Sequence, residues 1–374
     1  MRLRSLAPCL AAAACATSPG TDPATTAGAC PAPAGKLVLY AIPPGSSLDW
    51  STPNNLLDSV LASSDAGTAL VQSGQAVMTH EIGHVNVELD CGDFSIPLTG
   101  QTGGGTDWQS AGDGVGILLR DTPGAMNDTA AGDVADTTAD IAARQQSGKL
   151  SRISFVVNQA MCTRLKSFYD AYLQSGAFTH YAGLYRPRRF EGAGCAIFGA
   201  GMVDVGGLLR RSLFTPVWAR TEMIGSARIA NFAGSPSYQF GSDLVARDAS
   251  GHDWVWPEGQ SVPAPAGDPV WLGSPVLDAW SGPEDQPFPI AGLPGAMQSQ
   301  LPFSIYDPEL MAEWAEQVFA QARAQGSADS LGATWTADTV EAVHEVTYDA
   351  HCVAPQTLAF EADNDDLFAD SDAP

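Results

Sequence analysis

Hydrophobic and polar positions along the chain follow two periods, one typical of strands and the other of helices. A nearly continuous apolar run at 36–42 predicts a first strand, and the segment 150–157 predicts another. Apolar residues recur at helical spacing after Pro53, and again between Asn158 and Gly176, which we expect to cap that second helix at its two ends. The pattern therefore predicts a strand and a helix, and later a strand that leads directly into a helix.

The remaining segments add further helices and extended stretches. We expect helices over 133–144 and 307–326, and another that begins at Cys195. A short buried strand is predicted over 115–119, and a Trp-rich extended segment over 252–256. Strands and helices mixed in this way predict an α+β fold, in which an antiparallel sheet packs against helices.

The amino terminus has the pattern of a secretory signal. Arg2 and Arg4 precede an apolar stretch, 6–14, that is too short to span a bilayer. Small residues lead into Cys15, and this resembles the bacterial lipobox, in which the cysteine is acylated and becomes the new first residue. We expect an exported protein, either a membrane-anchored lipoprotein of the bacterial cell envelope or a periplasmic or secreted protein. A flexible linker rich in Thr, Pro, Ala and Gly follows over 16–35.

Composition and charge narrow the class of partner. Hydrophobic residues make up 45% of the chain and nine are tryptophan, which is enough to build a core. The formal net charge is −24, and such an acidic surface repels phosphate backbones and anionic lipid head groups. We therefore expect no nucleic-acid partner, and contact with a membrane only through the N-terminal lipid anchor.

The cysteines predict an oxidising compartment and one unpaired thiol. Of seven, Cys9 would leave with the signal and Cys15 would carry the lipid. The five that remain are Cys30, Cys91, Cys162, Cys195 and Cys352. Five is an odd number, so at least one thiol stays unpaired within the monomer, and spacing alone does not say which one.

A first chemical pattern is the HExxH sequence of zinc metallopeptidases. On a helix, His80 and His84 would share a face and bind one zinc ion, with Glu81 as general base. The residues from His84 to Asp90 instead alternate between polar and apolar, which favours a strand. A strand would not direct both histidines to one ion. Asp90 and Asp107 are poor third ligands, so a chance His-Glu pair before a strand is an equal alternative.

A second pattern joins His84 to Cys195. A cysteine at a helix amino terminus lies at the positive end of the helix dipole, which lowers the thiol pKa and favours thiolate. Gly192 and Gly194 allow close approach of the backbone. A strand histidine could then act as base and acid, while backbone N–H groups near Cys195 stabilise an oxyanion.

The order of these features resembles a known family. The features, in order, are the run from Gly83-His84 to Glu88, then a strand, a helix, a tyrosine-containing loop and Gly194-Cys195. In this order the chain resembles the circularly permuted papain-like fold of NlpC-type hydrolases and lecithin:retinol acyltransferase-like proteins. The resemblance implies that His84 activates Cys195, and that substrates are amides or esters such as cell-envelope peptides or lipid acyl groups. Gly194 departs from the asparagine found in many members, and no third polar residue is identified.

From this resemblance we expect a catalytic-type core at 36–215, a C-terminal elaboration packed on it at 216–360, and an acidic disordered tail at 361–374. The predicted activity is that of an exported cysteine hydrolase or acyltransferase that uses Cys195 and His84, needs no cofactor and acts on an envelope peptide or lipid. The alternatives are a zinc metallopeptidase and a non-catalytic envelope lipoprotein. Tyr181, in the loop before Cys195, is a candidate for substrate contact.

Overall fold

The computed structural model describes much of the chain between Cys30 and Cys352. The described residues are 30–49, 53–103, 122–128, 131–181, 187, 190, 192–208, 218–224, 239–240, 246–247, 301–325, 327–328 and 334–352. The chain divides into units 1–30 and 31–374, and the fold given below is that of the second unit. The predicted segments 1–15, 115–119, 252–256 and 361–374 lie outside the described residues.

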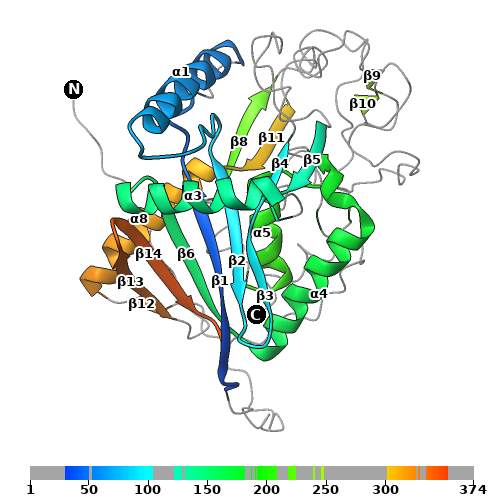
Figure 1. Ribbon diagram of the computed structural model, residues 1–374, viewed down its shortest axis with the longest axis vertical. Coiled ribbons are helices and arrows are strands. Elements are labelled where there is room, and N and C mark those ends of the chain that lie inside the picture. The colour runs from blue at the N-terminus through cyan, green and yellow to red at the C-terminus, as the bar shows by residue number, and fades with distance from the viewer. Residues whose placement is uncertain are drawn as a thin grey trace, which may run out of the picture. The chain divides into compact units, whose positions relative to one another are not determined.

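A seven-stranded sheet forms the centre of this unit (Figure 1). In spatial order its strands are β12 (Ser327–Ala328), β13 (Thr334–Val340), β14 (Val343–Asp349), β6 (Ser151–Asn158), β1 (Pro33–Ile42), β2 (His84–Asp90) and β3 (Ser95–Thr99). Neighbouring strands are antiparallel except for β14 and β6, which run parallel. The fold is α+β as predicted, but the sheet is mixed rather than antiparallel throughout. The long connection from β6 to β14 is what allows a parallel pair.

Strand β1 lies inside this sheet and is buried on both faces. Leu37, Leu39 and Ala41 belong to the main hydrophobic core. Val38, Tyr40 and Ile42 point the other way and pack with Ile141 of the helix on the opposite face. Burial on both sides explains why this strand shows a continuous apolar run instead of alternation. Its register with β2 pairs Ile42 with His84, so His84 lies at the end of the sheet.

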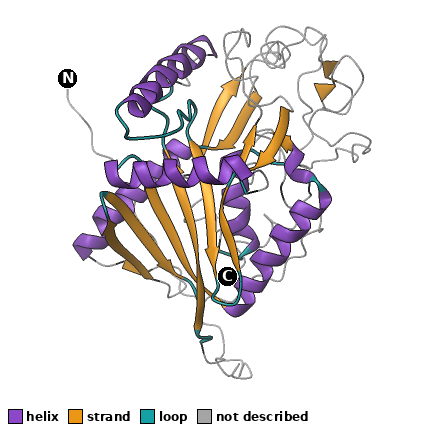
Figure 2. Ribbon diagram, in the orientation of Figure 1, coloured by secondary structure: helices purple, strands orange, loops and turns teal. Residues whose placement is uncertain are grey.

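Helices cover both faces of the sheet (Figure 2). The described helices are α1 (Pro53–Gln72), α3 (Ala131–Ser147), α4 (Gln159–Ser175), α5 (Cys195–Val205) and α8 (Pro308–Gln325), of which the last four pack on the sheet. Helix α3 crosses the face that carries Tyr40, while α4, α5 and α8 contribute Phe168, Phe198 and Met311 to the main core on the other. The sheet therefore lies between two layers of helix, and α5 packs directly on β2.

The helix ends agree with the sequence signals. The Asn158 side chain accepts a hydrogen bond from the Met161 N–H at 3.0 Å, which is an N-cap, and Gly176 ends α4 with φ 77°. Helix α5 begins at Cys195 as expected. The predicted helices over 133–144 and 307–326 correspond to α3 and α8.

Three smaller sheets are also present among the described residues. One consists of β4 (Gln101–Gly103), β5 (Thr122–Met126) and β7 (His180–Tyr181), and β7 follows a 3-10 turn, η1 (Ala177–Thr179). Another pairs β8 (Ala219–Ile224) with β11 (Leu301–Tyr306), and a third pairs β9 (Gln239–Phe240) with β10 (Ala246–Arg247). The first of these brings Tyr181 close to the end of β2.

Two segment boundaries differ from those predicted from the sequence. Strand β1 begins at Pro33, inside the linker predicted over 16–35, because this Pro- and Ala-rich end pairs with Asn158 of β6. The central sheet also contains strands from both the predicted core, 36–215, and the predicted elaboration, 216–360. The C-terminal segment therefore completes the sheet, since β13 and β14 form its far side.

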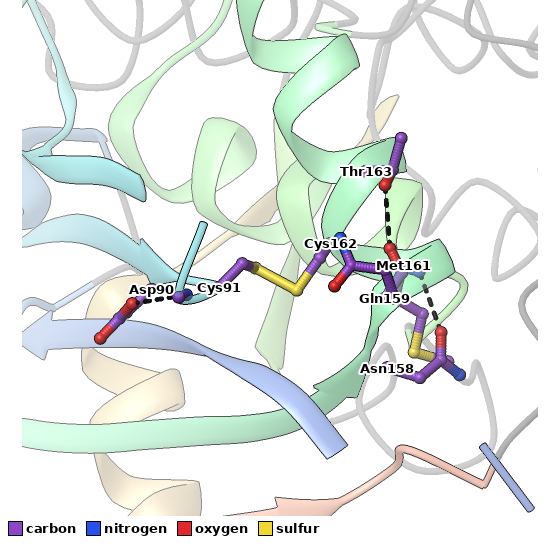
Figure 3. Close-up of a disulfide and its surroundings, with 8 residues drawn as sticks. Asp90, Cys91, Asn158, Gln159, Met161, Cys162 and Thr163 are labelled. Atoms are coloured by element: carbon purple, nitrogen blue, oxygen red, sulfur yellow. Dashed lines mark hydrogen bonds between the residues drawn. A yellow bond between two sulfur atoms is a disulfide. The ribbon is translucent and has the colours of Figure 1, made fainter. Parts of the chain in front are cut away.

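A disulfide ties β2 to α4 (Figure 3). Cys91, directly after β2, is bonded to Cys162, which lies in the first turn of α4 near the Asn158 cap. Cys30 and Cys352 are disulfide-bonded as well, whereas Cys195 is free and buried. Disulfides are consistent with an exported protein or an oxidising environment. Among the described residues, we find no helix with the length and apolarity that a membrane crossing requires.

Candidate functional site

His84 is placed by the turn that precedes it. Residues 79–83 form no helix, and the chain becomes extended at His84, the first residue of β2. Gly83 has φ +79°, and a Cβ there would lie 2.8 Å from the carbonyl oxygen of Ile42. Only glycine fits this conformation and this approach without strain. The turn therefore fixes where the strand begins, and with it the position of the imidazole.

Cys195 is placed by close packing of α5 on β2. Gly194 is the N-cap residue of α5, in an extended conformation, so Cys195 occupies the first helical position. One turn further on, a Cβ at Gly199 would lie 2.6 Å from a methyl carbon of Val85. The helix can approach the strand this closely because residue 199 has no side chain. Cys195 and His84 are therefore brought together although they are far apart in the sequence.

The environment of Cys195 favours the thiolate. Burial raises the pKa of the thiol, but the positive charge of His84 and a hydrogen bond with its side chain lower it. Hydrogen bonds from Tyr181 and from the Val85 backbone N–H also lower it, and the net pKa lies below the ordinary value of a cysteine. A thiol whose pKa is lowered by a neighbouring imidazole is the arrangement of an activated thiol nucleophile.

Tyr181 is a third member of this group. Its hydroxyl donates to the Cys195 sulfur at 3.8 Å. The strand that carries it, β7, is held because Gln101 Nε2 and the Ala193 N–H donate to the carbonyl oxygen of His180, at 2.6 Å and 3.3 Å. The tyrosine ring also lies against Gly103, where a Cβ would come within 2.7 Å of it. Burial raises the pKa of Tyr181 well above its ordinary value, so the hydroxyl keeps its proton and stays a donor.

The far side of His84 is crowded and polar. His84 is only 5% exposed, and its Nε2 atom meets no hydrogen-bonding partner in the part of the chain that the structure describes. A Cβ at Gly100 would lie 3.1 Å from this nitrogen and 2.4 Å from Asn86 Oδ1. Asn86 shares the strand face of His84, but its Oδ1 accepts from Asn127 Nδ2 at 3.1 Å. Among the residues that the structure describes, therefore, no side-chain acceptor orients His84 through Nε2.

A second histidine supports His84 from the α3 side. The rings of His80 and His84 are stacked, with centroids 4.7 Å apart and an interplanar angle of 15°. His80 Nε2 lies 3.1 Å from Asp140 Oδ2, and the same oxygen accepts from Arg144 Nε at 2.8 Å. Burial lowers the pKa of His80 to about 4, despite its hydrogen bond to Asp140. His80 is therefore neutral at neutral pH.

This geometry does not form the zinc site of the alternative prediction. The two histidines do not lie on a helix, because residues 79–83 form a turn and His84 begins a strand. An imidazole binds a metal through a nitrogen lone pair in the ring plane, and two nearly parallel planes do not converge on one ion. His80 Nε2 is already paired with Asp140, and Glu81 accepts from the Thr79 hydroxyl at 2.7 Å.

The other proposed ligands and histidines lie elsewhere. Asp90 is exposed at the opposite end of β2 and bonds the Gly92 N–H, while Asp107 and His252 lie outside the described residues. His344 contacts Glu316 and stacks on Phe319. His351 contacts Asp349 and also the Cys352 sulfur at 3.3 Å, but a disulfide cysteine has no thiolate to offer a metal. In the loop before Cys195, Tyr185, Arg186, Arg188 and Arg189 are likewise outside the described part.

The sequence did not single out Asp140 and Arg144. Both lie on α3 and both are almost fully buried. The available signal was an acid and a base four residues apart, within a predicted helix that must turn one face to the core. Gly100 and Gly103 were also missed, because nothing in the sequence shows that imidazole and phenol rings approach their α-carbons.

Comparison with known proteins yields no relative: no family model matches the chain, and no curated protein or solved structure matches it either. What the site can do chemically therefore has to be argued from its own geometry.

Proposed function

We propose that this protein is a thiol-dependent amide or ester hydrolase, or an acyltransferase, in which Cys195 is the nucleophile and His84 is the general acid and base. The observation that carries the proposal is the pairing of a free cysteine at a helix amino terminus with an imidazole that lowers its pKa. The other described cysteines are all disulfide-bonded. A thiol kept reduced beside a histidine, among disulfides, fits a catalytic role better than a structural one.

The reaction follows from the positions of the groups. The Cys195 thiolate attacks the carbonyl carbon of the substrate, and its electron pair forms a carbon–sulfur bond while the carbonyl oxygen becomes an oxyanion. The backbone N–H groups of the first turn of α5 have no partner within the helix, although that of Cys195 hydrogen-bonds Tyr181, so the N–H groups of this turn would stabilise the oxygen. The imidazolium of His84 gives its proton to the leaving amine or alcohol as the carbon–heteroatom bond breaks.

The second half of the reaction regenerates the thiolate. His84, now neutral, accepts a proton from water or from an acceptor alcohol or amine, which attacks the thioester carbonyl. The carbon–sulfur bond breaks, the acid or the transferred acyl product leaves, and Cys195 and His84 return to the charged pair. Tyr181 would stabilise the sulfur anion through its hydroxyl during both exchanges.

The family proposed for the chain is the circularly permuted papain-like group named above. Supporting this are the order in the chain, with the strand histidine before the helix cysteine, and the packing of α5 on β2 at Gly199. The lipobox-like end at Cys15 and the linker after it support a lipid-anchored envelope protein, with an envelope peptide or lipid as substrate. The proposed chemistry needs no cofactor.

One observation favours the non-catalytic alternative. Cys195 is only 5% exposed, so a substrate carbonyl reaches its sulfur only if the covering residues leave room. A non-catalytic envelope protein that retains this fold would also bury the cysteine. The catalytic and the non-catalytic alternatives differ in whether the Cys195 thiol reacts with an electrophile at neutral pH while the protein stays folded.

The test is labelling of the folded protein with a chloroacetamide probe, read by mass spectrometry on the peptide that contains Cys195, together with turnover of p-nitrophenyl acetate. We expect labelling and turnover in the wild type, and loss of both in Cys195→Ala. In His84→Ala we expect labelling at least about tenfold slower, because the thiol pKa rises. Glu81→Gln keeps the acceptor for Thr79 and is the matched control that should leave both signals unchanged.

Two results would contradict the proposal. An unlabelled Cys195 in folded wild-type protein would support the non-catalytic alternative. Stoichiometric zinc in the purified protein, lost in His80→Ala together with turnover, would support the peptidase alternative.

A further inference from the structure

His80 is held in a backbone conformation that most residues avoid. Its φ is +52°, in the left-handed region where a residue with a Cβ is uncommon. Such strain persists only where surrounding contacts over-determine the conformation, and it is concentrated at functional sites. The imidazole is almost completely covered, with 9% of its side chain exposed.

Helix α3 supplies the side chains that hydrogen-bond the segment ending at His80. Asp140 Oδ1 accepts the Val77 and Met78 N–H groups at 2.7 Å and 2.9 Å, and its Oδ2 lies at His80 Nε2. Arg144 bonds Asp140 and also donates to the carbonyl oxygen of Met78 at 2.6 Å. Two buried charges on one helix therefore clamp the segment 77–80 through Val77, Met78 and His80.

This clamp holds the His80 ring in the position where it stacks on the ring of His84. A ring that lies flat against another restricts rotation about the side-chain bonds of its partner, since tilting either ring would separate the two faces. His84 needs such a restraint, because its Nε2 makes no hydrogen bond among the described residues. A neutral aromatic face is also a favourable neighbour for the imidazolium form of His84. His80 with a proton would instead place two positive rings in contact.

We propose that His80 is a positioning residue for His84: the Asp140–Arg144 clamp holds the His80 ring flat against the catalytic imidazole and so keeps that imidazole directed at Cys195. This inference rests on the proposed function and adds to it. Orientation of a catalytic histidine by a stacked ring takes the place of a hydrogen bond to a third polar side chain. It also gives the His-Glu-containing sequence a role other than zinc binding.

The test separates the ring of His80 from its hydrogen bond. His80→Asn tolerates the left-handed conformation and can still bond Asp140, but has no ring to stack. His80→Phe keeps a ring and cannot bond Asp140. The readouts are the midpoint of the pH dependence of Cys195 alkylation by iodoacetamide, measured on the Cys195 peptide, and kcat and KM for p-nitrophenyl acetate. Circular dichroism confirms that each variant is folded.

We expect His80→Asn to raise the alkylation midpoint by about one pH unit and to lower kcat about tenfold with KM little changed, because a freely rotating His84 faces the thiol for only part of the time. We expect His80→Phe to return the midpoint to within about 0.3 of a unit of the wild type. If His80→Phe does not fold, Asp140→Asn serves instead, since it keeps the ring and loosens the clamp, and an intermediate shift is expected.

The inference fails if folded His80→Asn keeps the wild-type midpoint and kcat, or if folded His80→Phe shifts the midpoint as far as His80→Asn does. Failure of the proposed function itself looks different. In that case the wild-type midpoint would equal that of a Cys195-containing peptide and would not move in His84→Ala, and both proposals would fall together.

Discussion

The two ends of strand β2 each meet a buried cysteine, and they use it in opposite ways. At the carboxyl end, Cys91 is bonded to Cys162 of α4. At the amino end, His84 faces Cys195 of α5, whose sulfur is free. Both cysteines are almost fully buried in the same hydrophobic core, so burial alone does not distinguish them.

What distinguishes the two ends is the set of polar groups around the sulfur. Cys195 has an imidazole, a phenol hydroxyl and a backbone N–H that stabilise an anion, and it starts a helix. Cys162 lies within the first turn of α4, and its sulfur is covalently bonded to the sulfur of Cys91. One strand thus carries a covalent restraint at one end and charge chemistry at the other, and the first holds the sheet rigid for the second.

Removal of the free sulfur should have the largest effect on activity. Cys195→Ala should lower turnover of p-nitrophenyl acetate by about 10³-fold or more, because no other nucleophile is positioned at His84. The folded protein should change little in thermal stability, since alanine fits a position already packed tightly. Turnover within about tenfold of the wild type would show that the sulfur is not the nucleophile.

Removing the bonded sulfurs should have the converse effect. A Cys91→Ala, Cys162→Ala double variant opens a loop of sequence separation 71 and should lose about 4 kcal/mol of unfolding free energy. Urea unfolding at neutral pH measures this loss. The alkylation midpoint of Cys195 should stay where it is, and a shift as large as that of His84→Ala would mean that the two ends are not separate in function.

Acid should weaken the histidine end of β2. Burial lowers the pKa of His80 to about 4, against an ordinary 6.5, so between these values the unfolded chain binds a proton that the folded protein excludes. Stability contributed by neutral His80 is complete above pH 6.5 and is lost as the pH falls towards 4. The charged groups that face it are Asp140, Arg144 and His84, and the depressed pKa of Asp140 adds a further loss only below its ordinary value of 3.8.

The measurement is urea unfolding at pH 7 and pH 5. The His80 contribution should lower the wild-type unfolding free energy by about 2 kcal/mol over this interval. In His80→Phe this part of the fall in unfolding free energy between pH 7 and pH 5 should disappear. An unchanged fall in that variant would assign the pH dependence to other groups.

Tyr181→Phe should give the smallest effect. The variant removes one long hydrogen bond to sulfur, at 3.8 Å, and leaves the ring on Gly103. We expect the alkylation midpoint to rise by about 0.5 of a pH unit and turnover to fall a few-fold. A midpoint that does not rise would remove Tyr181 from the groups that stabilise the thiolate.

The parts of this structure that were predictable are those with local signals. The apolar run at 36–42 and the Asn158 and Gly176 caps of α4 depend on residues close in sequence, and the structure has them as expected. The meeting of His84 with Cys195 was expected from a resemblance in order and context, and the structure brings the two together.

The parts that were not predictable depend on distant contacts. Strand β14 pairs with β6 in parallel, across a separation that no local pattern encodes. The HExxH spacing suggested a helix, whereas Gly83 and the left-handed His80 create a turn that stacks the two rings. In the sequence, Asp140 and Arg144 resemble the ordinary charged residues of a helix surface. Only the packing of α3 in the fold shows that both are buried.

The most direct test of the central claim is the pH dependence of Cys195 alkylation in folded wild-type protein and in His84→Ala. A thiol held as thiolate by His84 should react with a midpoint below that of a Cys195-containing peptide, and the midpoint should rise in His84→Ala, where only the hydrogen bonds from Tyr181 and the Val85 N–H still oppose burial. Equal midpoints in wild type and variant would contradict the account.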